Sequence, residues 1–250
     1  RVAVCALPGS SVGLSSEVLA VELGAGAGLT LGRLSLGTRS VATVAEWTVR
    51  QAASSRLSLL VASCGGRLSR LSARVLLEGE GAEADVDSLY LSSLEELVDH
   101  HFLVDHRAPG CRSAMSCRGI VDAGGRAVFD GRTFVRSTAP RTDARQETRN
   151  LLLSDDAVLN AKPHLEIDND DVVCSHGATV GRLDESALFY MRARGIDAET
   201  AKALLTHAFV GEVIERLATA VPRSWVEAVR SRLPAAASLA EADTELGGAA

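Results

Sequence analysis

From residue 29 to residue 174 the chain alternates apolar and polar side chains with a period of two. Short stretches of this kind place a buried-type residue on one face and a polar or small residue on the other, as β-strands do. Glycines separate them, as expected where a chain turns a corner. The expected corner glycines are Gly32, Gly37, Gly65, Gly66 and Gly79. The predicted strands cover residues 29–31, 34–36, 57–59, 73–75, 101–104, 118–121, 127–129, 133–135, 151–153, 158–159, 165–167 and 172–174.

Many short strands with few helical periods are compatible with two architectures. One is a β-solenoid, in which each turn buries its face against its neighbours. The other is a β-sandwich or jelly roll, which the Gly-Gly pair at 124–125 and the Asp-Gly pair at 130–131 favour as hairpin turns. Nearly even steps between four apolar positions favour the stacked turns of a solenoid, which we prefer. These positions are Leu152, Val158, Leu165 and Val172.

After Gly181 the period changes to the 3.6 residues of a helix. Asp184 is expected to cap a first helix and Gly195 to end it, because glycine adopts the left-handed conformation that follows many helices. Asp197 is expected to cap a second helix, and Pro222 to open a third. The apolar stripes of these helices either dock a partner or pack on one another, and the pattern leaves both open. The predicted organisation is a β core at 1–182, a helical unit at 183–234 and a frayed tail at 235–250.

Composition narrows the class of protein. The 250 residues carry a formal net charge of −6, which argues against a nucleic-acid-binding surface. No apolar run reaches the roughly 18 residues that span a bilayer, so we expect a soluble protein with no membrane partner. The five cysteines are scattered and lack C-x-x-C spacing, which indicates a reducing compartment. The chain begins with Arg1, so we interpret it as a fragment or a processed chain.

Cys174 and His176 are the first candidates for chemistry. They lie two residues apart in a predicted strand, so they share one face while Ser175 points the other way. A thiol beside an imidazole suits soft or borderline metal ions, but a complete site needs further ligands from elsewhere. The alternative is a buried thiol beside a hydrogen-bonded histidine.

Other groups of polar residues are weaker candidates for a metal or catalytic site. D-H-H-F-L-V-D-H at 99–106 resembles a metal box, but His100 and His101 face opposite ways on a strand, so we interpret the cluster as solvated strand-edge residues. The acidic run at 168–171 lacks the glycine and glutamate of a calcium loop and is expected to be a turn. Cys111 and Cys117 are expected in the core. No phosphate loop, nucleophile elbow, H-E-x-x-H helix or carboxylate pair stands out, so we expect no enzyme.

Several segments together resemble the SufB/SufD family of the SUF iron–sulfur cluster assembly machinery. They are R-N-L-L-L-S at 149–154, K-P-H-L-E-I at 162–167, D-D-V-V-C-S-H-G-A-T-V-G at 170–181, L-F-Y at 188–190 and R-G-I at 194–196. Gly177, directly after C-S-H, indicates the SufD branch, because the SufB branch typically reads S-H-E-A there. A SufB-like cluster scaffold is one alternative. A carbohydrate-active β-helix enzyme is another, but it needs a pair of carboxylates along a groove.

The resemblance implies a right-handed parallel β-helix core followed by a small C-terminal α-helical domain. It implies a non-catalytic subunit that pairs with SufB through the C-terminal strands of the two β-helices and docks the SufC ATPase through its helical domain. ATP-driven dimerisation of SufC is then expected to rearrange the seam with SufB. The family usually has a further N-terminal helical region, which is missing here or divergent. The expected location is bacterial cytoplasm or plastid stroma.

The same resemblance implies roles for individual residues. The family's functional histidine corresponds to His176, with Cys174 beside it, and the principal cluster thiolate belongs to SufB. No cofactor is expected to be bound permanently, and iron or a nascent cluster is expected to be held transiently at the seam. The chemistry fits, because an imidazole beside a thiol can complete an iron site whose other thiolates come from a partner. The expected interface residues are Val172, Val173, Cys174, Ser175, His176, Phe189 and Tyr190.

Overall fold

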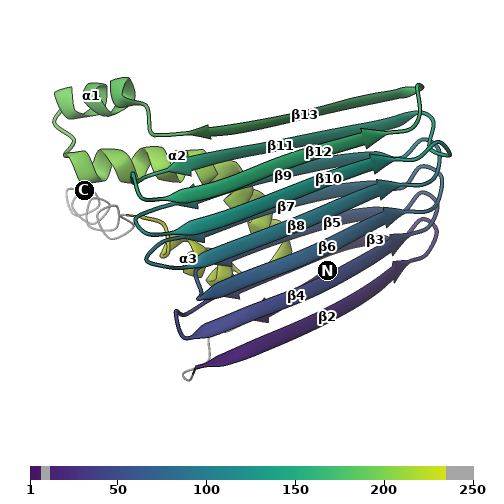
Figure 1. Ribbon diagram of the computed structural model, residues 1–250, viewed down its shortest axis with the longest axis horizontal. Coiled ribbons are helices and arrows are strands. Elements are labelled where there is room, and N and C mark those ends of the chain that lie inside the picture. Colours follow the sequence, from purple (N-terminus) through teal and green to yellow (C-terminus); the bar gives the residue numbers. More distant parts are fainter. Residues whose placement is uncertain (7–11, 235–250) are drawn as a thin grey trace, which may run out of the picture.

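The computed structural model describes residues 1–6 and 12–234. These residues form a parallel β-solenoid of about six turns with three helices after it. Successive strands alternate between two parallel sheets, so the chain winds around a common interior (Figure 1). The odd sheet contains β1 (Val2–Ala6), β3 (Gly28–Leu36), β5 (Arg56–Cys64), β7 (Glu83–Ser92), β9 (Arg112–Val121), β11 (Thr142–Leu152) and β13 (Val172–Gly181). The even sheet contains β2 (Gly13–Leu23), β4 (Val41–Gln51), β6 (Leu68–Leu77), β8 (Leu97–His106), β10 (Arg126–Val135) and β12 (Val158–Ile167).

The strands are longer than the sequence pattern predicted. Residues 29–31 and 34–36 both belong to β3, and residues 127–129 and 133–135 both belong to β10. The hairpin turn at 130–131 that would have favoured a sandwich does not form, since both residues lie in the middle of β10. Gly32 likewise lies within β3, where a Cβ atom would come within 2.5 Å of Val221 on the helical layer. Glycine at this position therefore makes room for packing. The parallel pairing of every strand also excludes the sandwich alternative.

Gly37 is a corner glycine, as predicted, and it lies directly after β3. A Cβ atom there would come within 2.4 Å of the Cα atom of Gly66, which stands at the corner of the next turn. Backbone segments at stacked corners approach too closely for a side chain, so glycine is required there. Gly79 meets the same restriction against Ala53.

Two apolar layers hold the fold together. The first lies between the two sheets and includes Trp47, Leu59, Tyr90 and Phe129, all fully buried. The second lies on the outer face of the odd sheet, where the helices cover it. It includes Leu60, Leu89 and Ile120 from the strands and Val210, Ile214, Leu217 and Val229 from the helices. Strands such as β5 are therefore apolar on both faces, as is usual where both faces of a parallel sheet are covered.

The three helices begin where the sequence predicted, and the first also ends where predicted. The Asp184 side chain accepts a hydrogen bond from the Ser186 amide at the start of α1 (Glu185–Ala193), and Gly195 follows this helix with a φ of +88°. Asp197 accepts from two amides at the start of α2 (Ala198–Ala220), and Pro222 precedes α3 (Arg223–Arg230). The caps satisfy amides that the helices leave unpaired. Among residues 1–6 and 12–234, no helix combines the length and apolarity needed to cross a bilayer. The tail at 235–250 lies outside the described residues.

Candidate functional site at the open end of the solenoid

The odd sheet ends at β13, which pairs with β11 on one side and with no other strand among the described residues. Figure 1 shows β13 along the rim of the stack, leading directly into α1. Most of its residues are exposed, including Val173 and Val180. Such an end strand presents unpaired backbone N–H and C=O groups along its free side. The stretch that carries the candidate cysteine and histidine is thus an exposed edge.

Cys174 and His176 lie on the side of β13 that faces the solenoid interior. In the parallel ladder Cys174 stands beside Ala144, and His176 stands beside Gln146. Gln146 is buried and donates a hydrogen bond to the Gly131 carbonyl of the even sheet, so its side chain points inward. Paired residues of a parallel ladder point the same way, so the thiol and the imidazole extend these inward rows to the open end. Their Cα atoms are about 6.6 Å apart, two strand rises of about 3.3 Å.

The surroundings of the two side chains differ. Cys174 is half-buried, and its partial burial raises the pKa of the thiol above its ordinary value. The thiol is therefore protonated at neutral pH, and a metal ion must displace that proton to bind it. His176 is exposed. Within the described part of the chain no three Cys, His, Asp or Glu side chains come together as a metal site. A metal ion held here needs ligands from outside these residues.

A groove of about 450 Å³ lies between β13 and α2 on the outer face of the odd sheet, next to the backbone of His176. Ser175 and Gly177 line it on the β13 side, and Glu212 and Arg216 line it on the helix side. The strand between them contributes Arg145 and Glu147, and β9 contributes Arg118. The edge strand and the helical layer therefore border one charged groove.

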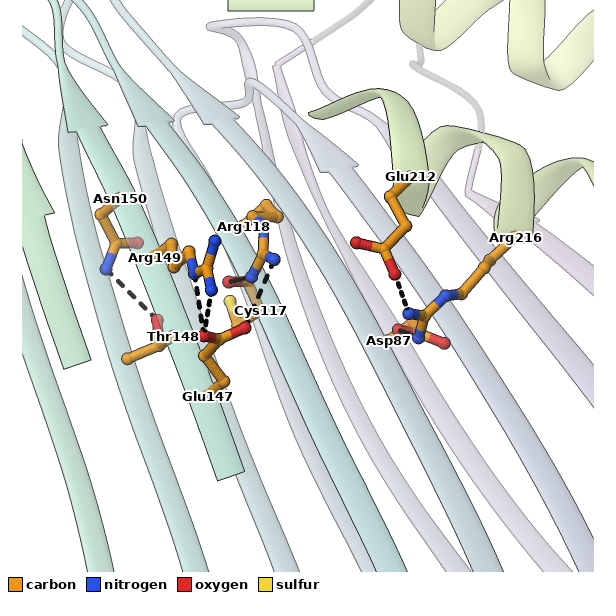
Figure 2. Close-up of polar contacts among 9 residues, drawn as sticks. All are labelled: Asp87, Cys117, Arg118, Glu147, Thr148, Arg149, Asn150, Glu212 and Arg216. Carbon is orange, nitrogen blue, oxygen red and sulfur yellow. Dashed lines mark hydrogen bonds and ion pairs between the residues drawn. The ribbon is translucent and has the colours of Figure 1, made fainter. Parts of the chain in front are cut away.

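An ion-pair cluster anchors α2 to the sheet near this groove (Figure 2). Arg216 donates to Asp87 of β7 at 2.7 Å and also pairs with Glu212 on its own helix. Burial raises the pKa of Asp87 to about 6, although the Arg216 charge acts in the opposite direction. Closer to β13, Glu147 accepts from the buried Arg118 and from Arg149. The pairs Arg216–Asp87 and Arg118–Glu147 could not be predicted from the sequence, because they join elements far apart in the chain.

A buried hydrogen-bond chain fixes β13 to the turn beneath it. Tyr90 donates to the Asn150 side-chain oxygen, and the Asn150 amide donates to the Thr179 carbonyl at 3.2 Å and to Thr148. Figure 2 shows the Asn150–Thr148 contact on β11. Asn150 and Tyr90 are fully buried, so each hydrogen bond left unmade would cost about 1–3 kcal/mol. This chain was also absent from the sequence prediction.

The prediction that the cluster at 99–106 consists of solvated strand-edge residues was wrong, because β8 lies in the middle of the even sheet. Its buried members are Asp99, His100, Asp105 and His106. His100 and His106 are fully buried between the sheets. His100 contacts the hydroxyls of Ser88 and Ser63, and His106 contacts Ser113. These histidines face inward because the even-numbered residues of β8 point into the core. This orientation follows from the pairing register of β8 with β6.

The opposite orientation of His100 and His101 was predicted correctly. His101 faces outward, opposite to His100, and its Nε2 atom lies 2.7 Å from Asp99. The acidic run at 168–171 forms the turn between β12 and β13, as expected. Cys111 and Cys117 are buried in the core, as expected.

The buried histidines predict that stability falls as the pH falls. Burial lowers the pKa of His100 to about 3 and that of His106 to about 4, so the folded chain takes up these protons later than the unfolded chain, which does so near pH 6.5. Each histidine therefore lowers the free energy of unfolding by about 1.4 kcal/mol for every pH unit below pH 6.5, until the pH reaches its pKa in the folded chain. Below pH 6 the folded chain takes up a proton at Asp87 before the unfolded chain does, because the pKa of Asp87 is raised. This uptake stabilises the folded chain and offsets the loss of stability from about one of the two histidines.

Urea unfolding between pH 7.5 and pH 4.5 measures this dependence. His106→Gln should flatten the pH dependence, whereas the control His164→Gln, on the exposed β12, should leave it unchanged. Equal stability at pH 7 and pH 5 in the unsubstituted chain would contradict the assignment of both buried histidines as neutral.

The first helix stands apart from the core. None of the residues of α1 is buried, and its Phe189 and Tyr190 side chains are 74% and 59% exposed. The Arg194 guanidinium lies over the Tyr190 ring and donates to its hydroxyl at 2.7 Å, which holds that ring on the surface. Leu204 of α2 is also exposed. Large apolar side chains concentrated on one exposed element are typical of a protein–protein contact.

These features place the chain among parallel β-solenoid proteins that carry a helical layer on one sheet. The family model for "SUF system FeS cluster assembly, SufBD core domain" matches residues 2–209. The chain therefore belongs to the SufB/SufD family of iron–sulfur cluster assembly proteins, as its motifs indicated.

The curated relatives include SufD proteins. The chain is 39% identical over 153 residues to the iron–sulfur cluster assembly protein SufD of Escherichia coli, covering 61% of this chain and 36% of that protein. It is 41% identical over 174 residues to the chloroplastic protein ABCI7 of Arabidopsis thaliana, covering 68% and 36%. It is 30% identical over 141 residues to SufD of Bacillus subtilis, covering 56% and 32%. The chain thus spans about a third of the length of these relatives.

Proposed function

We propose that this chain is a SufD-type, non-catalytic subunit of an iron–sulfur cluster assembly complex. It pairs with a SufB-type subunit along β13 and docks a SufC-type ATPase through α1 and α2. The observation that carries the proposal is that β13 is an open edge strand bearing Cys174 and His176 side by side. Bacterial and chloroplastic relatives support a place in bacterial cytoplasm or plastid stroma.

The composition of the two end strands favours β13 as the pairing edge. Soluble proteins protect free edges with charged residues and proline. The neighbouring end strand β12 contains both, in Lys162 and Pro163. By contrast β13 reads V-V-C-S-H-G-A-T-V-G and contains neither a proline nor a residue with a permanent charge. An edge without such protection is suited to extension by a strand of another chain.

Pairing along β13 supports a transient site for iron or a nascent cluster, which is the cargo of assembly. Cys174 and His176 supply at most one thiolate and one imidazole, and the described residues bring no third ligand to them. The principal thiolate is assigned to the SufB-type partner. Enclosure between two solenoids would exclude water from the cargo until the seam opens.

The helical layer supports a mechanical link between an ATPase and this seam. The exposed apolar residues of α1 provide a docking surface, and α2 is fixed to β7 by Arg216 and Asp87. A force applied to the helices is therefore transmitted to the odd sheet, whose last strand is β13. ATP-driven dimerisation of the docked subunits would move this edge and expose Cys174 and His176.

The substitution His176→Ala tests the site. It should leave the fold and the complex intact, because the imidazole is exposed and has no hydrogen bond to another described side chain. Cluster formation should fall by about tenfold or more, since even the loss of a hydrogen-bond partner of a metal ligand costs about 10–100-fold. The measurement is the activity of iron–sulfur enzymes in cells that depend on the variant.

His164→Ala is the matched control. This histidine also lies on an end strand, but it is half-buried and pairs with Glu166 on the outer face of β12. It should support cluster formation at the unsubstituted level. Normal enzyme maturation by His176→Ala, with the variant incorporated into the complex, would contradict the role proposed for His176.

A further inference from the structure

The outer face of the even sheet contains a hollow of about 620 Å³ that the proposed assembly role does not use. It lies over β4, β6, β8 and β10, the strands in front in Figure 1. Five arginines and two aspartates line it, and Glu46 and Glu78 also pair with three of these arginines. Five positive groups against four carboxylates leave a small positive excess in a chain whose formal net charge is −6. The arginines are Arg50, Arg74, Arg107, Arg132 and Arg136.

In this hollow the aspartate carboxylates are more deeply buried than the arginine side chains. The carboxylates lie at the floor, where the side chains of Asp105 and Asp130 are 2% and 10% exposed. The five guanidinium-bearing side chains above them are 40–55% exposed. At Arg107, Arg132 and Arg136 an approaching anion therefore meets the guanidinium groups before the aspartates that hold them. Arg74 pairs instead with Glu46, which is 54% exposed.

Shared carboxylates leave hydrogen-bond donors free. Asp105 accepts from both Arg107 and Arg136 at 2.8 Å, and Glu78 contacts both Arg50 and Arg107. Two carboxylates thus serve three arginines. Each guanidinium carries five N–H donors, of which these contacts use one or two.

Strand geometry sets the spacing of the charges. Arg74 and Arg132 stand in one row of the ladder on either side of Leu103. Two strand spacings of about 4.8 Å place their Cα atoms about 9.6 Å apart. On the strand between them, Leu103 and His101 line the hollow. This separation suits a ligand with two or more anionic groups better than a single small ion.

We propose that this hollow binds a small, multiply charged oxyanion, either a polyphosphate or a polycarboxylate. Guanidinium groups recognise both through paired, charge-assisted hydrogen bonds. The site is separate from β13 and the groove at His176, and its failure would leave the proposed assembly role unaffected.

Isothermal titration calorimetry at low ionic strength tests the proposal with sodium tripolyphosphate and, separately, with citrate. We expect saturable binding of at least one of them, and the stronger ligand identifies the phosphate or the carboxylate class. The double variant Arg74→Gln, Arg132→Gln should weaken binding at least tenfold. The control Arg56→Gln, Arg223→Gln removes the same charge from exposed positions elsewhere and should bind as the unsubstituted chain does.

A second variant protects the test against misfolding. If Arg74→Gln, Arg132→Gln does not fold, Arg50→Gln, Arg74→Gln takes its place, because the carboxylate partners it leaves are exposed or shared. Absence of saturable binding of either anion, or equal loss in the hollow and control variants, would overturn the proposal.

Discussion

The chain carrying Val173→Lys together with Val180→Lys is expected to lose its complex with a SufB-type subunit while remaining folded. Both valines are more than half exposed on the end strand β13, so neither contributes much to the core. Val173 stands beside Asp143 in the ladder, which tolerates a lysine. A strand pairing with β13 would have to desolvate both ammonium groups, which costs several kcal/mol. The dissociation constant should rise about 100-fold or more, as measured by analytical ultracentrifugation or calorimetry.

The opposite end of the solenoid offers the matched control. Leu14 and Val18 are exposed apolar residues on β2, the other end strand of the even sheet. Leu14→Lys with Val18→Lys adds the same charge to an edge that the proposal does not use. This control should bind the partner as the unsubstituted chain does. If the β13 variant binds equally well, pairing along β13 is wrong.

The second large effect is expected from Gly119→Ala in β9. A Cβ atom there would lie 2.2 Å from the Tyr90 ring and 2.4 Å from the Asn150 side-chain oxygen. These are the two residues that connect the interior to the Thr179 carbonyl of β13. Overpacking costs about 1–3 kcal/mol, and a broken buried hydrogen bond costs about 1–3 kcal/mol more. The free energy of unfolding should therefore fall by about 2–6 kcal/mol in urea titrations.

Gly177→Ala is the control for this substitution. Gly177 lies on β13 itself, and a Cβ atom there would meet nothing within 4 Å. Its free energy of unfolding should stay within about 0.5 kcal/mol of the unsubstituted value. Equal destabilisation by the two alanines would show that the close approach of Tyr90 and Asn150 to Gly119 is not what limits stability.

The sequence pattern predicted the solenoid correctly but not the lengths of its strands. Alternation and corner glycines such as Gly37 follow from local chemistry, and so do the helix caps at Asp184 and Asp197. The even steps from Leu152 to Val172 do not correspond to turns, because two of those positions lie in the same strand, β12. Glycine within a strand was mistaken for a corner, since the helix that packs against Gly32 lies far away in the sequence.

Which face of a strand is inside could not be read from β8 alone. His100 and Phe102 face the core, while Asp99 and His101 face outward. Each face of β8 carries both polar and apolar residues, so the alternation alone does not show which face is buried. Pairing with the neighbouring strands decides this. His100 is compatible with the core because serine hydroxyls contact both of its ring nitrogens, whereas only Nε2 of His106 has such a partner.

The candidate site was also only partly predictable from the sequence. The shared face of Cys174 and His176 follows from strand alternation, and the structure adds that this face lies at the open end of the solenoid. The contacts that position the strand were beyond reach of the sequence. Asn150 meets Thr179 only because one full turn of the solenoid separates them, and Arg216 meets Asp87 only because α2 lies on the odd sheet.

Amide hydrogen exchange of β13, measured with and without a SufB-type subunit, tests the central claim most directly. The account predicts that amides of residues 172–181 become protected when the partner is added, while those of β2 at the opposite end exchange as before. Binding of the partner without new protection in residues 172–181, or with protection confined to other strands, would contradict it.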